Sequence, residues 1–339
     1  MENLNLLVQK YANRGEQTNI AIGLRPSGVI HLGNLSSLGL AGIVGGKIGP
    51  HLSNVGVTIC DLDMPDSREW SMKEHGYVRY FNSLPSKNPN ETLLQHAMTG
   101  ISKYLGGLES YLGVRFNIKM LSDIQREEKF RTGLKKVLDT PEIMQFLHSG
   151  VEPGKVLVFP ICSQCKTSNP HQPAYRDGKI LTSCTNPECS VEEYEMDVMD
   201  CNRDLAVHFF IDPLRDRTVK PYADIHVFGG DYSEEHENSK IRKIDKIARV
   251  THIASGSNPD IIIGPTFYAR DGSKMSKSKN NGLSVETLEQ HFGSDYHIKI
   301  LDFLNRIVSE RFSHVDYALV EKYLLNPVET SSSSSSPSV

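Results

Sequence analysis

The sequence contains no long apolar run, and none approaches the roughly 20 residues that a membrane-spanning helix requires. The segment Met1–Asn5 also lacks the basic flank and the apolar core of a signal peptide. We therefore expect a cytoplasmic protein with no membrane partner. In that compartment the six cysteines are expected to be reduced thiols or metal ligands, because disulfides rarely persist there.

An excess of positive charge is absent as well. The formal net charge is −4, so the composition gives no global sign of nucleic-acid binding, although a local basic face remains possible. The 339 residues, 38% hydrophobic and 23% charged, suit one large globular domain with an insertion, or two domains. No internal repeat is found, and the serine run at 331–336 predicts a disordered tail.

Strand and helix signals alternate in the order of a nucleotide-binding α/β unit. A buried strand is predicted at 18–24, followed by a Pro-Ser-Gly turn and a helix from Gly33 to about Val44. A second strand, Val55–Ile59, leads into two aspartates at its carboxyl end. The other predicted elements are a helical region at 92–150, strands at 206–211, 225–228 and 261–263, a helix at 241–248 and a mostly helical region at 285–325.

Four cysteines are clustered in a segment that has no helical periodicity. The spacing Cys162-x2-Cys165 and Cys184-x4-Cys189 is close to that of a four-thiolate zinc ribbon. Four protein ligands leave no open position for catalysis, so we expect a structural Zn²⁺ that staples a small insertion. The alternative is four unrelated buried thiols. His171 is expected at the surface, and Cys60 and Cys201 are expected to be core thiols.

These signals predict an α/β fold: a Rossmann-like parallel sheet with a zinc-ribbon insertion and a short helical C-terminal extension. The predicted division is residues 1–154 and 201–282 for the halves of the nucleotide-binding domain, 155–200 for the insertion, 283–326 for the extension and 327–339 for the tail.

A turn of small residues, Pro26-Ser27-Gly28-Val29-Ile30-His31-Leu32-Gly33-Asn34, joins the first strand to the first helix. Gly28 and Gly33 allow a phosphate to approach the backbone, and N–H groups at a helix start favour anionic oxygen. His31 can hydrogen-bond a phosphate as charge builds up in the transition state. Alternatively, His31 only satisfies the turn.

A second motif, Lys274-Met275-Ser276-Lys277-Ser278, lies among small and polar residues. Mobile ammonium groups in such a loop can close on pyrophosphate and release it afterwards. The alternative is a solvated basic loop. Taken with the first motif, in this order, it predicts an ATP site built from both ends of one domain, where the α-phosphate is attacked.

The two motifs resemble the HIGH and KMSKS signatures of the class I aminoacyl-tRNA synthetases. The first is present as His31-Leu32-Gly33-Asn34, and the second is intact. The form Pro-Ser-Gly-x-x-His-x-Gly-Asn is most similar to the class I lysyl-tRNA synthetases. The similarity continues through Thr58–Pro65, the cysteine insertion and Phe228-Gly229-Gly230-Asp231, and covers about residues 18–300.

The resemblance implies a ligase that converts ATP, accompanied by Mg²⁺, and an amino acid into an aminoacyl-adenylate. His31 and Asn34 would contact ATP phosphate, and Lys274 and Lys277 the leaving pyrophosphate. Asp61 and Asp63 would hold the ammonium groups of lysine or a relative, or, alternatively, cap a strand end. Asp212 is a third substrate candidate, Asp231 would bind adenosine, and the remaining ATP-binding residues would be Pro26, Ser27, Gly28, Gly33, Gly230, Met275, Ser276 and Ser278.

The chain also departs from that family. Gly230 and Tyr232 replace a lysine and a histidine, and His208–Pro213 replaces a tryptophan-rich run of the amino-acid pocket. About 40 residues follow the nucleotide domain, too few for the family's anticodon-reading region. The acceptor is therefore either a tRNA acceptor stem or another molecule, such as a modified nucleotide, a metabolite or a carrier protein. A third hypothesis is a non-catalytic relative that binds an amino acid or RNA.

A basic helix is predicted at 240–249, where five cations lie opposite an apolar face: Lys240, Arg242, Lys243, Lys246 and Arg249. Such a face either touches an RNA backbone or is simply solvated, and solvation is the commoner case.

Overall fold

The computed structural model describes residues 4–27, 30–65, 70–147, 150–207, 223–230, 259–275 and 282–326. Its centre is a five-stranded sheet in the order β10-β9-β1-β2-β3, with every pair parallel. The strands are β1 (Thr18–Leu24), β2 (Ser53–Ile59), β3 (Phe116–Met120), β9 (Ile225–Phe228) and β10 (Asp260–Ile263). This order confirms the predicted Rossmann-like parallel sheet, in which the three predicted strands 18–24, 225–228 and 261–263 are neighbours.

The chain changes direction across the sheet at β1. It runs outward from β1 through β2 to β3, and then returns to place β9 on the other side of β1. In open α/β sheets ligands bind outside the carboxyl ends of the strands at such a switch point. Pro26-Ser27 follows β1 and Gly229-Gly230 follows β9, so both segments lie at this edge.

The expectation of a continuous helical region at 92–150 is wrong in one part. β3 lies within it and pairs with β2 from Val55↔Phe116 to Ile59↔Met120. Its sequence Phe-Asn-Ile-Lys-Met alternates apolar and polar residues, which is the period of a strand. The flanking helices are α4 (Leu93–Leu112), α5 (Leu121–Arg126), α6 (Glu128–Leu138) and α7 (Pro141–Leu147).

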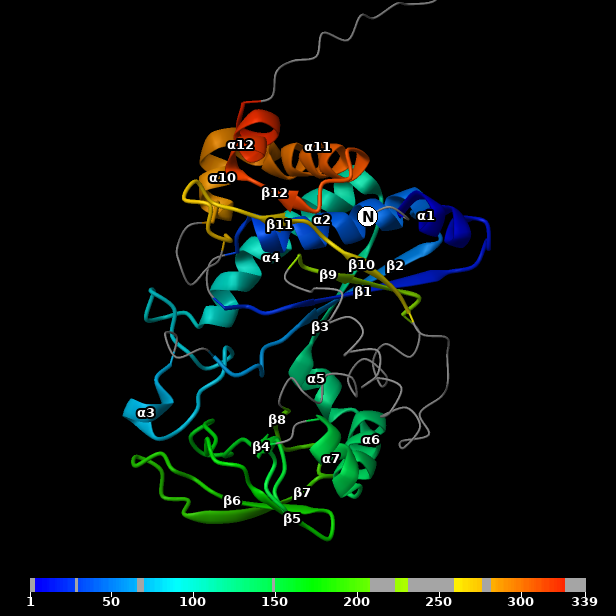
Figure 1. The fold of residues 1–339 in the computed structure, drawn as a ribbon. Coiled ribbons are helices and arrows are strands. Elements are labelled where there is room, and N and C mark those ends of the chain that lie inside the picture. Colours follow the sequence, from blue (N-terminus) through cyan, green and yellow to red (C-terminus); the bar gives the residue numbers. More distant parts are fainter. Residues whose placement is uncertain are drawn as a thin grey trace, which may run out of the picture.

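Helix α2 (Leu32–Ile48) is the centre of the main core and is buried almost throughout its length. It packs on the sheet and is covered by α1 (Leu4–Ala12), α4 and α11 (Tyr296–Ser309). Figure 1 shows these helices together on one side of the sheet. A Cβ at Gly39 would lie 2.7 Å from Leu304 Cδ1, so the absence of a side chain at this position lets α11 approach closely.

The C-terminal extension covers this layer, as predicted, with mostly helical structure. It consists of α10 (Val285–Phe292), the 3₁₀ turn η3 (Gly293–Asp295), α11, α12 (Tyr317–Val320) and the π-helical turn η4 (Glu321–Leu325). A two-stranded parallel pair, β11 (Thr266–Phe267) with β12 (His314–Val315), joins it to the segment that follows β10.

A second core lies at the opposite end of the molecule from α11 (Figure 1). It contains the three-stranded antiparallel sheet β5 (Ala174–Arg176), β6 (Lys179–Ser183) and β7 (Glu193–Asp197), and the pair β4 (Val158–Pro160) and β8 (Leu205–Val207). Helices α5, α6 and α7 pack into the same core. The strand predicted from residue 206 therefore begins as β8 beside β4 and not in the central sheet, because its apolar residues meet Val158 and Phe159.

Several predicted segments lie outside the described residues. They are the basic helix at 240–249, the run 208–213 and the tail from 327. Among the described helices, none combines the length and the hydrophobicity needed to cross a bilayer. The short helix α3 (Met72–His75) lies between β2 and α4.

Candidate functional site

His31 is the N-cap residue of α2, with extended backbone angles of φ −124° and ψ 170°. Its Nδ1 accepts a hydrogen bond from the Gly33 N–H at 3.0 Å. Because Nδ1 accepts, the ring proton resides on Nε2, and the neutral imidazole presents a donor away from the helix. A Cβ at Gly33 would lie 2.9 Å from His31 Cε1, so glycine is required there for the ring to lie over the helix start.

The backbone N–H groups at the start of α2 are already bonded. Leu32 N–H donates to Leu283 O at 2.8 Å, Gly33 N–H to the imidazole, and Asn34 N–H to His31 O at 2.9 Å. The expectation that N–H groups of this helix start bind phosphate is therefore not supported for these three. Side chains remain as the groups that can hold an anion here. Asn34 Oδ1 is buried and has no hydrogen-bond partner among the described residues.

The second motif begins on a hairpin. Met275 N–H donates to Phe267 O at 2.8 Å, Tyr268 and Lys274 form an antiparallel bridge, and Ala269 N–H donates to Ser273 O at 2.8 Å. Met275 is buried in the main core, whereas Lys274 is exposed. The hairpin thus anchors the motif by its methionine and leaves the first lysine at the surface.

The far end of the same loop rests on the first motif. Val285 N–H donates to Ile30 O at 3.0 Å, and His31 and Ser284 form an antiparallel bridge. A Cβ at Gly282 would lie 3.4 Å from His31 Cβ, so a side chain at this position would be in contact with the histidine. Residues 276–281 complete the loop and include Ser276, Lys277 and Ser278. They lie outside the described residues, as does Gly28. The loop's described ends nevertheless join the two motifs.

Gly230 lies at the carboxyl end of β9, against the segment that follows β10. Its carbonyl accepts a hydrogen bond from Thr266 Oγ1, and a Cβ at Gly230 would lie 2.5 Å from the backbone of Pro265. A side chain therefore does not fit at this position, where the resembling family has a lysine. Asp231 and Asp212 lie outside the described residues.

The two aspartates after β2 differ in exposure. Asp61 is 2% exposed, and its Oδ1 accepts from Ser122 N–H at 3.0 Å. Burial raises the pKa of Asp61, while the Ser122 bonds oppose the shift. These contacts favour the capping alternative for Asp61. Asp63 is half-buried, and its N–H donates to Cys60 O at 3.2 Å. Their role toward a substrate stays a prediction.

Arg25 is a candidate that the sequence did not single out. It follows β1 directly and precedes Pro26, which is buried, and Ser27, which is half-buried. Its guanidinium lies 5.1 Å from the ring of Phe81 and donates to Met64 O. A cation at the carboxyl end of the central strand stands where an anionic ligand is expected. A lone arginine before a proline gives no sequence signal; only the fold places it.

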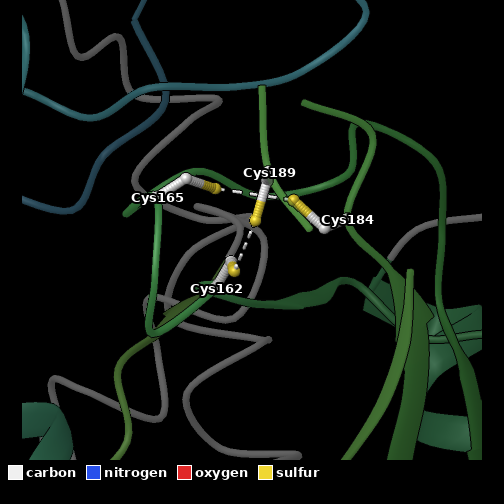
Figure 2. Close-up of side chains that lie close together, drawn as sticks. All are labelled: Cys162, Cys165, Cys184 and Cys189. Carbon is white, nitrogen blue, oxygen red and sulfur yellow. Dashed lines mark hydrogen bonds between the residues drawn. The ribbon is translucent and has the colours of Figure 1, made fainter. Parts of the chain in front are cut away.

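The four predicted cysteines converge, as Figure 2 shows. The sulfur atoms all lie within 4.8 Å of one another, with Cys162 to Cys189 at 3.7 Å and Cys165 to Cys184 at 3.5 Å. A tetrahedral zinc with Zn–S bonds of about 2.3 Å separates its sulfurs by about 3.8 Å. The thiols are therefore close to the arrangement that zinc requires, and none of the four forms a disulfide.

Local backbone bonds shape the first knuckle of this centre. Cys162 N–H donates to Thr167 O at 2.8 Å. Lys166, which has a φ of 58°, donates its N–H to Cys162 O at 3.0 Å. Burial raises the pKa of the Cys165 thiol, but hydrogen bonds with Thr167 outweigh it and lower that pKa to about 6. The thiolate is the form that ligates zinc, and at Cys184 burial acts in the opposite direction and raises the pKa of the thiol to about 12.

No protein-family profile matches the chain, and no curated protein matches it. Among solved structures, the chain is similar to tyrosyl-tRNA synthetase from Archaeoglobus fulgidus complexed with L-tyrosine, with a TM-score of 0.43 and 17% identity over 84% of this chain and 68% of that one. It is also similar to a putative arginyl-tRNA synthetase from Campylobacter jejuni, with a TM-score of 0.40 and 10% identity over 94% and 71% of the two chains. TM-scores this low add no evidence to the topology described above. The candidate site is therefore supported by the residues of this chain alone.

Proposed function

We propose that the protein is an adenylate-forming ligase of the class I aminoacyl-tRNA synthetase type. The observation that carries the proposal is the junction of the two motifs. The His31 turn and the segment after the second motif are hydrogen-bonded to each other at the carboxyl edge of a parallel sheet, next to its switch point.

The reaction is the attack of an amino-acid carboxylate on the α-phosphorus of ATP. A P–O bond forms to the carboxylate, the bond to pyrophosphate breaks, and no covalent enzyme intermediate is needed. His31 Nε2 and the Asn34 side chain would donate hydrogen bonds where charge builds up at phosphate. Lys274 and Lys277 would neutralise the leaving pyrophosphate. Mg²⁺, when bound with ATP, would neutralise further phosphate charge.

Lysine is the first amino acid to test, since the Pro-Ser-Gly-x-x-His-x-Gly-Asn form is of the lysyl type. Of the two aspartates that follow β2, Asp63 is the one with the exposure needed to meet an ammonium group. The proposed acceptor is the 3′ end of a tRNA, reached through its acceptor stem. Transfer to a different acceptor is the outcome that would correct this part of the proposal.

The test is ATP–pyrophosphate exchange with lysine, followed by the other standard amino acids. We expect exchange with at least one, and expect Lys277→Ala to slow it by about 100-fold or more. Lys47→Ala removes the same charge at the far end of α2 and is the matched control. No exchange with any standard amino acid would refute standard amino-acid activation. Transfer measured with and without total tRNA then identifies the acceptor class.

A further inference from the structure

The segment between α3 and α4 pairs with the cysteine insertion. Val78 and Ser168 exchange both backbone hydrogen bonds, at 2.9 and 3.0 Å. The hydroxyl of Tyr80 lies 2.5 Å from Ser168 Oγ. All three residues are buried, with Val78 and Tyr80 0% exposed and Ser168 2% exposed. This contact is therefore a specific, water-excluded connection between two parts of the molecule.

On the insertion side, the connection continues directly into the metal ligands. Ser168 follows Thr167, whose carbonyl accepts from Cys162 N–H and whose Oγ1 lies 3.1 Å from Cys165 Sγ. The first knuckle is therefore bonded, through Thr167 and Ser168, to the segment that holds Tyr80.

On the other side, the connection reaches the turn Pro26–Asn34, where ATP is proposed to bind and which is called the ATP turn below. Phe81 follows Tyr80, is 0% exposed, and lies under the Arg25 guanidinium. Arg25 also donates to the carbonyl of Met64, next to Asp63. The cysteine knuckle and the residue before Pro26 are thus joined through one buried tyrosine and one buried phenylalanine.

We propose that the four-cysteine centre, when it holds zinc, positions Arg25 at the ATP turn through Tyr80 and Phe81. Tyr80 and Ser168 are positioning residues, and their hydroxyl pair is the connection. The kinetic consequence rests on the proposed function, since it concerns ATP. The structural consequence, a change in the segment around Tyr80 and Phe81 when zinc is removed, does not depend on the proposed function. It is measured independently of activity.

Trp70 reports on this segment, because it is the only tryptophan in the chain and its Nε1 donates to Tyr77 O at 2.8 Å. Removing zinc from the full-length protein with a chelator should shift the Trp70 emission and increase its access to a soluble quencher. Returning zinc should restore both signals. Unchanged emission and quenching after complete zinc loss would overturn the proposal.

Substitutions separate the connection from simple unfolding of the insertion. In Tyr80→Phe we expect about one zinc per chain under zinc excess. Because the Tyr80 hydroxyl bonds Ser168 beside the first knuckle, zinc retention against a chelator should weaken by about fivefold or more, and the KM for ATP should rise with little change in kcat. Tyr175→Phe is the matched control: its hydroxyl lies in the insertion and donates to Asp139 Oδ1 at 2.5 Å, and its charged neighbours are aspartates and not the cysteines or Tyr80.

Equal effects in the Tyr80 and Tyr175 variants would overturn the proposal, because the role would then be structural only. If Tyr80→Phe folds poorly, Ser168→Ala is added, since removing both hydroxyls leaves neither one buried without a partner. The double variant should fold and keep the weakened zinc retention. A double variant with normal zinc retention and a Trp70 signal that still follows zinc would also overturn it. A folded protein without ATP exchange refutes the function but not the Trp70 response.

Discussion

His31 has two tasks in this structure, and they reside on different ring nitrogens. Nδ1 caps α2 through Gly33 N–H, and Nε2 is the proposed donor to ATP phosphate. Asparagine can place an oxygen near the Nδ1 position and is among the best N-cap residues. Glutamine can place an amide N–H near the Nε2 position but is a poor cap. The variants His31→Asn and His31→Gln therefore separate the two tasks.

The magnitudes differ enough to be resolved. Losing an N-cap costs about 1 kcal/mol of folding free energy, whereas losing one donor to a transition-state oxyanion costs about 100- to 1000-fold in kcat. We expect His31→Asn to unfold close to the wild-type urea midpoint, with exchange reduced at least 100-fold. We expect His31→Gln to lose about 1 kcal/mol of stability and to retain more exchange than His31→Asn.

The assay is ATP–pyrophosphate exchange, paired with urea unfolding followed by circular dichroism. His31→Ala is the reference in which both tasks are lost. Exchange at the wild-type rate in His31→Asn would refute a role for Nε2. A stability in His31→Asn as low as in His31→Ala would refute the capping assignment.

Changes away from the ATP turn test the packing that supports it. Burial raises the pKa of Asp61 above its ordinary 3.8. Between the pKa of the unfolded chain and that of the folded protein, the folded protein therefore keeps a proton that the unfolded chain releases. The free energy of unfolding falls as the pH rises through this range. Asp61→Asn should remove this fall, which begins at about pH 4 where the unfolded carboxyl titrates, and an unchanged slope in urea titrations over a series of pH values would contradict it. Arg131 is 0% exposed and donates to the carbonyls of Gln125, Val198 and Arg203, so Arg131→Leu should cost about 3 kcal/mol or more by urea unfolding; a loss under 1 kcal/mol would contradict it. Gly39→Ala should be destabilised, because overpacking of about 1–3 kcal/mol exceeds the helix gain of about 1 kcal/mol, whereas Gly46→Ala, with its nearest atom at 3.8 Å, should melt higher. Elemental analysis should find about one zinc per chain, and its absence from folded protein would contradict the metal centre.

The central sheet could be predicted where the signal was local. Runs of β-branched residues locate β1, β2, β9 and β10 to within about two residues. The cysteine spacing likewise indicated a single cluster, because two short knuckles define most of a tetrahedron before the chain folds.

Pairing partners were harder to predict. β3 was hidden between two helices, and the strand predicted at 206–211, in the second half of the nucleotide-binding domain, begins as β8 and pairs with β4. Both strands are short, and a run of three to five residues does not specify which sheet it joins. Arg25 became a candidate only through Phe81 and Met64, which are distant in sequence.

Gly33 has a structural role that the sequence did not indicate. The sequence suggested that its missing side chain admits a phosphate. In the structure, the space that a Cβ would fill holds the His31 ring, 2.9 Å from that position, and the Gly33 N–H is bonded to the same ring. The glycine therefore fixes the imidazole, and the imidazole occupies the N–H that a phosphate would have used. In the proposed function, side chains and not these backbone N–H groups would therefore hold an anion at this helix start. The second motif, whose far end is bonded to the first through Leu32 N–H and Leu283 O, would supply the lysines.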